Sequence, residues 1–141
     1  MNSRAFFVVS AAVAVLFALG FLAIPRAVAR IYGIVAHEDA LLAFRYFGVA
    51  LLGVGLIFWF AKDVQDRDAR NAILTGAGIA NQIGLVVTLW GTTSGMMNAL
   101  GWTVALLYLA LAAGCFYFRG EDRVLTWDSL PVKSLRRTIP K

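Results

Sequence analysis

The segment AFFVVSAAVAVLFALGFLAI, residues 5–24, contains no charged side chain over its 20 residues. A bilayer hydrocarbon core of about 30 Å needs ~20 helical residues at ~1.5 Å each, so this segment is long enough to cross a membrane once. Three more apolar segments follow, residues 40–61, 72–90 and 96–118, with lengths of 22, 19 and 23 residues. The four segments together contain one charged residue, Arg45. They predict an all-α integral membrane protein, organised as a four-helix bundle.

The composition favours the same fold class. Hydrophobic residues make up 60% of the 141 residues, and the mean hydropathy is +0.75. A soluble bundle of this composition would need helices that are apolar on every side, which soluble helices are not. We therefore expect one membrane domain, residues 1–118, followed by a basic cytoplasmic tail, residues 119–141.

The amino-terminal segment has a second interpretation, a cleaved signal peptide, because Ala27-Val28-Ala29 resembles a cleavage site. The apolar core of a signal peptide is usually ~7 to 15 residues long, and the run here is longer. We therefore expect a first span. Ser10 is its only polar residue, which suggests a wall that faces lipid or a partner protein. The connection that follows, residues 25–33, fits either a short amphipathic helix in the interface or an irregular loop.

The basic residues predict the orientation in the membrane. If the amino terminus is cytoplasmic, the inner segments carry ten Lys and Arg residues: Arg4, Lys62, Arg67, Arg70, Arg119, Arg123, Lys133, Arg136, Arg137 and Lys141. The outer connections carry Arg26 and Arg30. The positive-inside rule then places both termini in the cytoplasm. Topology and contact with anionic lipids account for the net charge of +5, so we expect no nucleic-acid partner.

The sequence offers little for catalysis. His37 is the only histidine in the chain, so the cluster His37-Glu38-Asp39 lacks the second histidine that a zinc motif would need. Glu38 and Asp39 better suit the first turn of the second span, where a negative charge complements the helix dipole. The single cysteine, Cys115, has no partner for a disulfide, and the four spans contain no Asp or Glu. We expect no enzyme activity, no metal and no cofactor.

The third span carries small residues at every fourth position: Ala72, Gly76, Ala80 and Gly84. Small residues let helix backbones approach closely in lipid, so we expect this ribbon to close the chain's own bundle. Packing against a neighbouring protein is the alternative. Asn81 and Gln82, at the centre of the span, should face protein or a polar cavity, because an amide turned to lipid is left unsatisfied.

Two functions fit these features. The first is a non-catalytic accessory, assembly or stabilising subunit that contacts lipids and other integral membrane proteins through its spans and its tail. The candidate docking residues in the tail are Trp127, Leu130, Arg136 and Arg137. The alternative is a pocket for a small amphipathic molecule, a quinone or a lipid. Its candidate ligand residues are Arg45, Asn81, Gln82 and Trp102.

Three motifs carry a resemblance to a known family. They are Arg45-Tyr46-Phe47-Gly48 at the start of the glycine-rich second span, the connection from Pro25 to Gly33, and Gly101-Trp102 in the fourth span. In these motifs the chain resembles the small four-helix bacterial membrane proteins of the DoxX-like type and similar families. The resemblance covers the four spans but not the tail. It implies a bacterial inner-membrane location and a link to redox or quinone metabolism, and it transfers no catalytic residue.

Overall fold

The computed structural model describes residues 3–128, with side chains as far as residue 119. This part of the chain forms five α-helices and no strand, which confirms the all-α prediction. The helices are α1 (Ser3–Ala23), α2 (Pro25–Ile31), α3 (Glu38–Ala61), α4 (Arg67–Thr93) and α5 (Gly101–Asp128). Four of them, α1, α3, α4 and the first 19 residues of α5, are long and apolar enough to cross a membrane.

The connection after the first span is helical and not an irregular loop, whereas its place in the membrane interface stays a prediction. Pro25 begins α2, where its fixed φ suits the first turn and its missing N–H costs nothing. Gly33 follows the helix with a φ of 75°, a conformation that glycine adopts without strain. The chain then enters α3, whose first turn contains Glu38 and Asp39, as their charge predicted.

The third and fourth spans begin at other residues than the apolar segments of the sequence predict. Helix α4 begins at Arg67, ahead of the predicted residue 72, because the Asp66 carboxylate caps it and accepts a hydrogen bond from the Asp68 N–H at 2.9 Å. Helix α5 begins at Gly101 instead of residue 96. The chain turns at Gly95, which has a φ of 77°, and hydropathy alone does not detect such a turn.

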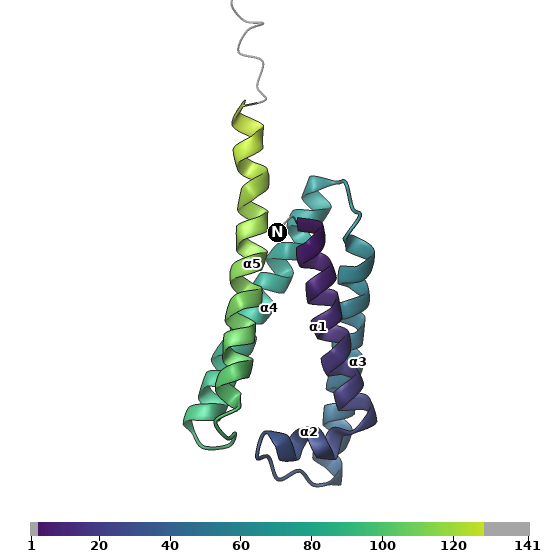
Figure 1. Cartoon of the computed structure of the whole chain (residues 1–141), viewed down its shortest axis with the longest axis vertical. Coiled ribbons are helices and arrows are strands. Elements are labelled where there is room, and N and C mark those ends of the chain that lie inside the picture. The colour runs from purple at the N-terminus through teal and green to yellow at the C-terminus, as the bar shows by residue number, and fades with distance from the viewer. Residues whose placement is uncertain (1–2, 129–141) are drawn as a thin grey trace, which may run out of the picture.

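The four long helices pair as two antiparallel hairpins, α1 with α3 and α4 with α5. Figure 1 shows the long helices of the two hairpins close together near the start of α1 and apart at the other end, where α2 reaches toward the α4–α5 turn. The arrangement is therefore more open than an evenly packed four-helix bundle. We call the two ends of the molecule the α2 end and the opposite end. The start of α1, the α3–α4 connection and the far end of α5 all lie at the opposite end (Figure 1).

The main core is a cluster of buried side chains at the opposite end. It contains Phe6, Phe7, Ala11, Phe58, Ala61, Leu74, Cys115 and Phe118. These residues come from all four long helices, so this cluster is where the two hairpins pack together. In a membrane, contacts of this kind act through van der Waals packing, because lipid tails are as apolar as the side chains.

Candidate ligand cavity between the helical hairpins

Glycines allow close contact within each hairpin. A Cβ added at Gly55 of α3 would lie 2.8 Å from Val15 Cγ2 and 3.3 Å from the Ala11 carbonyl oxygen of α1. In the other hairpin, a Cβ at Gly78 of α4 would lie 2.9 Å from Phe116 Cζ of α5. A side chain at Gly55 would press on the backbone of α1 as well as on Val15, and a side chain at Gly78 would displace the Phe116 ring. Each hairpin is therefore a tightly packed unit, and the open space lies between the two.

Aromatic rings join the hairpins at the opposite end. The Phe6 ring of α1 lies 5.1 Å from the Phe118 ring of α5, centroid to centroid. Gly114 of α5 faces the Phe6 ring so closely that a Cβ would collide with it. Within the first hairpin, the rings of Phe7 and Phe58 lie 5.6 Å apart. These rings close the space between the hairpins at this end.

Asn98 joins the hairpins at the α2 end. Its backbone N–H donates to the Tyr32 carbonyl at 2.9 Å, and its side-chain Nδ2 donates to the Ile31 carbonyl at 2.8 Å. Both acceptors lie at the carboxyl end of α2, where helix carbonyls lack partners within the helix. The Asn98 Oδ1 accepts from the Leu100 N–H at 3.0 Å, next to the start of α5. One residue therefore connects the α4–α5 turn to α2.

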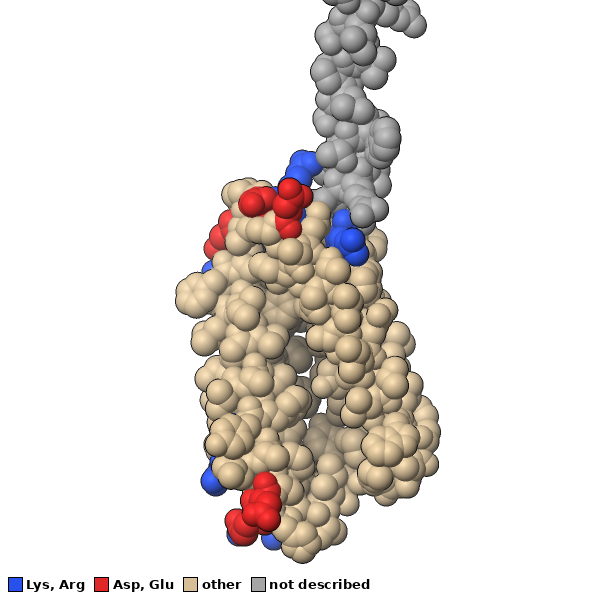
Figure 2. Space-filling view, turned by 180° about the vertical axis from the view of Figure 1, so that it is seen from behind, with Lys and Arg blue, Asp and Glu red and all other residues tan. Residues whose placement is uncertain are grey.

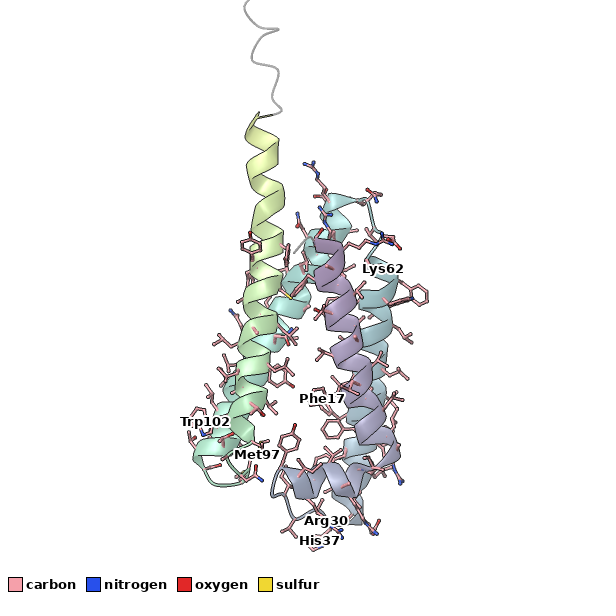
Figure 3. All side chains as sticks on the ribbon, viewed as in Figure 1. Phe17, Arg30, His37, Lys62, Met97 and Trp102 are labelled. Carbon is pink, nitrogen blue, oxygen red and sulfur yellow. The ribbon has the colours of Figure 1, made fainter. Side chains whose placement is uncertain are left out.

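A cavity of about 380 Å³ lies between these two contacts. All four long helices and the α2 region line it, mostly with apolar side chains. Five phenylalanines contribute to the wall: Phe17, Phe21, Phe44, Phe47 and Phe58. Figure 3 shows Phe17 of α1 pointing into the space between the hairpins, and Figure 2 shows this space as a hollow between two columns of atoms.

Five lining residues have a side-chain oxygen or nitrogen: Ser10, Tyr32, Asn81, Thr88 and Tyr108. The Asn81 Nδ2 donates to the Ala77 carbonyl at 2.8 Å, which leaves the second N–H of the amide and its Oδ1 available to a ligand. Ser10 is 3% exposed, and its Oγ has essentially no accessible surface and no hydrogen-bond partner in the described part of the chain, so the groups that face the cavity come from the other four residues. The cavity thus combines an apolar wall with a few hydrogen-bonding groups.

Among the described residues that line the cavity, none is an Asp, Glu, Lys, Arg or His. Burial raises the pKa of Tyr32 above its ordinary value of 10.0, so its hydroxyl stays neutral at physiological pH. Acidic and basic side chains gather toward the two ends of the face shown in Figure 2. Arg4 and Asp63 pair at 3.1 Å at the opposite end, and Arg26 pairs with Glu38 at the α2 end. The cavity is therefore an uncharged space between charged ends.

The structure brings one of the four predicted ligand residues, Asn81, to the cavity. Arg45, Gln82 and Trp102 have exposed side chains, and none of them lines the cavity. Figure 3 shows Trp102, which is 51% exposed, on the side away from the other hairpin. Arg45 follows the lining residue Phe44 by one position, which turns it ~100° around the helix. The same rotation separates Gln82 from Asn81, so the expectation that Gln82 faces protein or a polar cavity is wrong within this chain.

The small-residue ribbon of α4 lies largely on the outer surface. Ala72, Gly76 and Ala80 are exposed, and a Cβ added at Gly76 would meet no atom within 4 Å. Successive members of a four-residue repeat advance ~40° around a helix, so the ribbon turns inward only at its end. There Gly84 contacts the ring of Tyr108, whose Cε1 would lie 2.6 Å from an added Cβ. The expectation that the whole ribbon closes the chain's own bundle is therefore wrong.

The predicted docking residues of the tail are not placed by the structure. Trp127 belongs to the last turn of α5, where only the backbone is described. Leu130, Arg136 and Arg137 lie outside the described residues. Their role as partner contacts stays a prediction.

Sequence reasoning missed two residues that shape the cavity. Ser10 was expected on a plain outer wall, yet it is buried and lines the cavity. Its isolation as the one polar residue in a 20-residue apolar run was the available signal. Asn98 fell inside a segment predicted to be a span. Asn98 comes three residues after Gly95, in the turn that must connect the third span to the fourth, and this position was the available signal.

Comparison with known proteins gives no relative for this chain: no family model matches it, and neither a curated protein nor a solved structure shows significant similarity. The resemblance to DoxX-like proteins stays a prediction.

Proposed function

We propose that this protein is a multi-pass protein of the bacterial inner membrane that binds one small amphipathic molecule, of the lipid or quinone class, in the cavity between its two hairpins. The cavity itself is the observation that carries the proposal: about 380 Å³ of mostly apolar space with uncharged polar groups in its wall. Pockets for small molecules are typically concave, mostly apolar and fitted with a few polar groups that orient the ligand.

The size of the cavity favours a single chain or ring as the occupant. A water-sized group takes about 30 Å³, so the space holds on the order of a dozen methylene-sized groups. A whole two-chain phospholipid is too large. One acyl or isoprenoid chain, or a quinone ring with the start of its tail, fits.

The membrane setting follows from the arrangement of charge. In this proposal the opposite end, with the start of α1, the far end of α5 and the basic residues Lys62, Arg67 and Arg70, faces the cytoplasm. The cavity then lies at the depth of the lipid tails, where an amphipathic molecule is already concentrated. Its described lining offers neither a carboxylate nor an imidazole for acid–base chemistry, so we propose binding without catalysis.

Two neighbouring leucines of α5 provide a matched test. Leu107 lines the cavity, whereas Leu106 is 65% exposed. Leu107→Trp should fill the cavity, and Leu106→Trp should leave it open. Organic extracts of the purified proteins are compared by mass spectrometry. We expect one species near a 1:1 ratio in the wild type and in Leu106→Trp, and at least tenfold less of it in Leu107→Trp. Identical lipid content in all three proteins would refute the binding proposal.

A second function, an accessory subunit of a larger membrane complex, is favoured by the outward ribbon of α4. Gly76 lies open on the surface, between the exposed residues Ala72 and Ala80, and small-residue surfaces of this kind suit close contact with another helix. Purification in a mild detergent should then recover a stoichiometric partner that Gly76→Leu removes. Gly53→Leu is the control, because Gly53 of α3 is equally open. A wild-type chain that migrates alone would count against this function.

A further inference from the structure

We infer that the α2 end carries a second site, in which Arg26 and Arg30 bind a phosphate group. The site is a pocket of about 280 Å³ between α2, the residues that follow it and the start of α3. Arg26, Ala29 and Arg30 line it, together with residues 34–36 and Leu41. Neither arginine lines the cavity between the hairpins, so this inference does not rest on the proposed function.

The pocket forms because the chain turns back at the end of α2. The Gly33 N–H donates to the Arg30 carbonyl at 3.0 Å, and the Ile34 N–H donates to the Ala29 carbonyl at 2.9 Å. This pair of bonds is the Schellman arrangement, and Gly33 has the positive φ that it requires. Residues 34–36 are thereby held beside the face of α2 that carries the two arginines, and the pocket lies between them.

The charge of the pocket is positive. Arg26 and Arg30 are four residues apart on α2, a spacing at which like charges share one helix face and repel each other. Glu38 pairs with Arg26, but neither Glu38 nor Asp39 lines the pocket. The Arg30 guanidinium has no ion pair or hydrogen bond within the described part of the chain. One positive charge at the pocket therefore lacks a counter-charge, which an anion would supply.

A phosphate group fits the donors and the size of this pocket. The planar fork of a guanidinium matches the oxygens of a phosphate, and it can donate two hydrogen bonds to them. Arg26 bonds to Glu38 through Nη2, which leaves its other N–H groups for a ligand. At about 30 Å³ for a water-sized group, the pocket holds on the order of nine such groups. This is room for a phosphate and the glycerol unit next to it.

The surroundings favour a lipid headgroup as the source of the phosphate. Val35 lines the pocket and is 87% exposed, and Ile31, next to Arg30, is exposed as well. Exposed apolar side chains beside cations suit contact with a membrane surface, where acyl chains begin below charged headgroups. The pocket also lies where candidate spans end, which is the depth of the headgroups in a membrane. A free phosphate has the same chemistry, so the experiment must separate the two sources.

Native mass spectrometry of the full chain in dodecyl maltoside micelles, which contain no phosphate, tests the site. Four probes are titrated: phosphatidylglycerol, a diacylglycerol with the same chains, glycerol phosphate and inorganic phosphate. Arg30→Gln removes the charge that lacks a partner. Arg45→Gln is the matched control, because Arg45 of α3 is an exposed arginine that lines neither the pocket nor the cavity. Glu38→Gln removes the partner of Arg26.

We expect phosphatidylglycerol to bind at least tenfold more tightly than the diacylglycerol. Arg30→Gln should weaken that binding about tenfold, the effect of one charged hydrogen bond, and Arg45→Gln should bind as the wild type does. Glu38→Gln should bind about two- to fivefold more tightly, a gain that a folding defect would not produce. Leu107→Trp, which fills the cavity between the hairpins, should leave the binding unchanged, so the two sites are tested separately.

The two sources of phosphate give different results. Phosphatidylglycerol binding at least tenfold more tightly than glycerol phosphate identifies a lipid headgroup, whereas equal binding identifies a free phosphate. The inference is overturned if Arg30→Gln binds as the wild type does, if Arg45→Gln loses as much as Arg30→Gln, or if the diacylglycerol binds as well as phosphatidylglycerol. It is also overturned if none of the three phosphate probes binds.

Discussion

At the α2 end, the only hydrogen bonds between the described hairpins come from a single residue, Asn98. Its backbone and side chain donate to consecutive carbonyls, those of Tyr32 and Ile31. Gly33 allows this approach, since its α carbon faces the Asn98 side chain and an added Cβ would lie 3.2 Å from Asn98 Cβ. The rest of the cavity wall at this end consists of side-chain packing. The hydrogen bonding that joins the hairpins at the α2 end therefore depends on one residue.

Asn98→Asp tests this role, because aspartate keeps the oxygen that accepts from Leu100 but loses the donor to Ile31. A net hydrogen bond is worth about 0.5 to 1.5 kcal/mol, so the closed arrangement should lose about two- to tenfold in population. Spin labels at Val35 and Ser94, in a Cys115→Ala background, report the distance across the α2 end by pulsed electron resonance. We expect a longer and broader distance distribution in Asn98→Asp. An unchanged distribution would show that side-chain packing alone holds this end.

At the scale of elements, each hairpin is organised by where its glycines point. Gly55 and Gly53 of α3 are two residues apart and so point in different directions, about 200° apart around the helix. Gly55 is buried against Val15 and Ala11 of α1, whereas an added Cβ at Gly53 would meet no atom within 4 Å. The same contrast separates Gly78, which packs on α5, from the open Gly76 in α4. Glycine content alone does not distinguish the packed positions from the open ones.

The pair in α3 gives a direct comparison. Gly55→Leu should lower the free energy of unfolding by about 1 to 3 kcal/mol, because overpacking forces α1 and α3 apart. Gly53→Leu adds the same side chain to the same helix but should change that free energy by less than about 0.5 kcal/mol, as surface substitutions usually do. Unfolding of both variants can be followed by thermal melts in one detergent. Equal destabilisation by the two substitutions would mean that α3 presents a different face to α1.

At the scale of the whole molecule, two hairpins are joined at both ends and separated between them. Phe6 and Phe118 make the contact at the opposite end, and Asn98 makes it at the α2 end. Contacts at two points leave the middle of the molecule free to hold a ligand without unfolding either hairpin. Such an arrangement is expected to open and close more readily than a closely packed bundle, because few side chains must move.

The orientation in the membrane can be tested with two cysteines in a Cys115→Ala background. We expect Gln65→Cys, in the α3–α4 connection, to react with a membrane-impermeant maleimide only after the inner face is made accessible. Ser94→Cys, in the α4–α5 turn, should react in intact cells. The reverse pattern would place the termini outside the cytoplasm and would refute the orientation predicted from the positive-inside rule.

The spans follow from local properties of the chain. A run of about 20 apolar residues has few alternatives in a bilayer to an α-helix, because every backbone N–H and C=O must be bonded internally. The helices α1, α3, α4 and α5 were predictable for this reason. The residues at which the helices begin and end were harder to predict from hydropathy. The Asp66 cap acts through a hydrogen bond and the Gly95 turn acts through a backbone angle, and hydropathy records neither.

The direction in which each helix turns its side chains depended on the tertiary structure. Asn81 faces the cavity and Gln82 does not, Gly55 is packed and Gly53 is open, and Ser10 is buried in the most uniformly apolar span. In water, the hydrophobic effect would mark the buried face of each helix in its residue pattern. In these four helices, which are long and apolar enough to cross a membrane, both faces are largely apolar, so the pattern along the chain carries little of this information. The pairing of helices therefore decides which face is inside, and with it the position of the cavity and its polar groups.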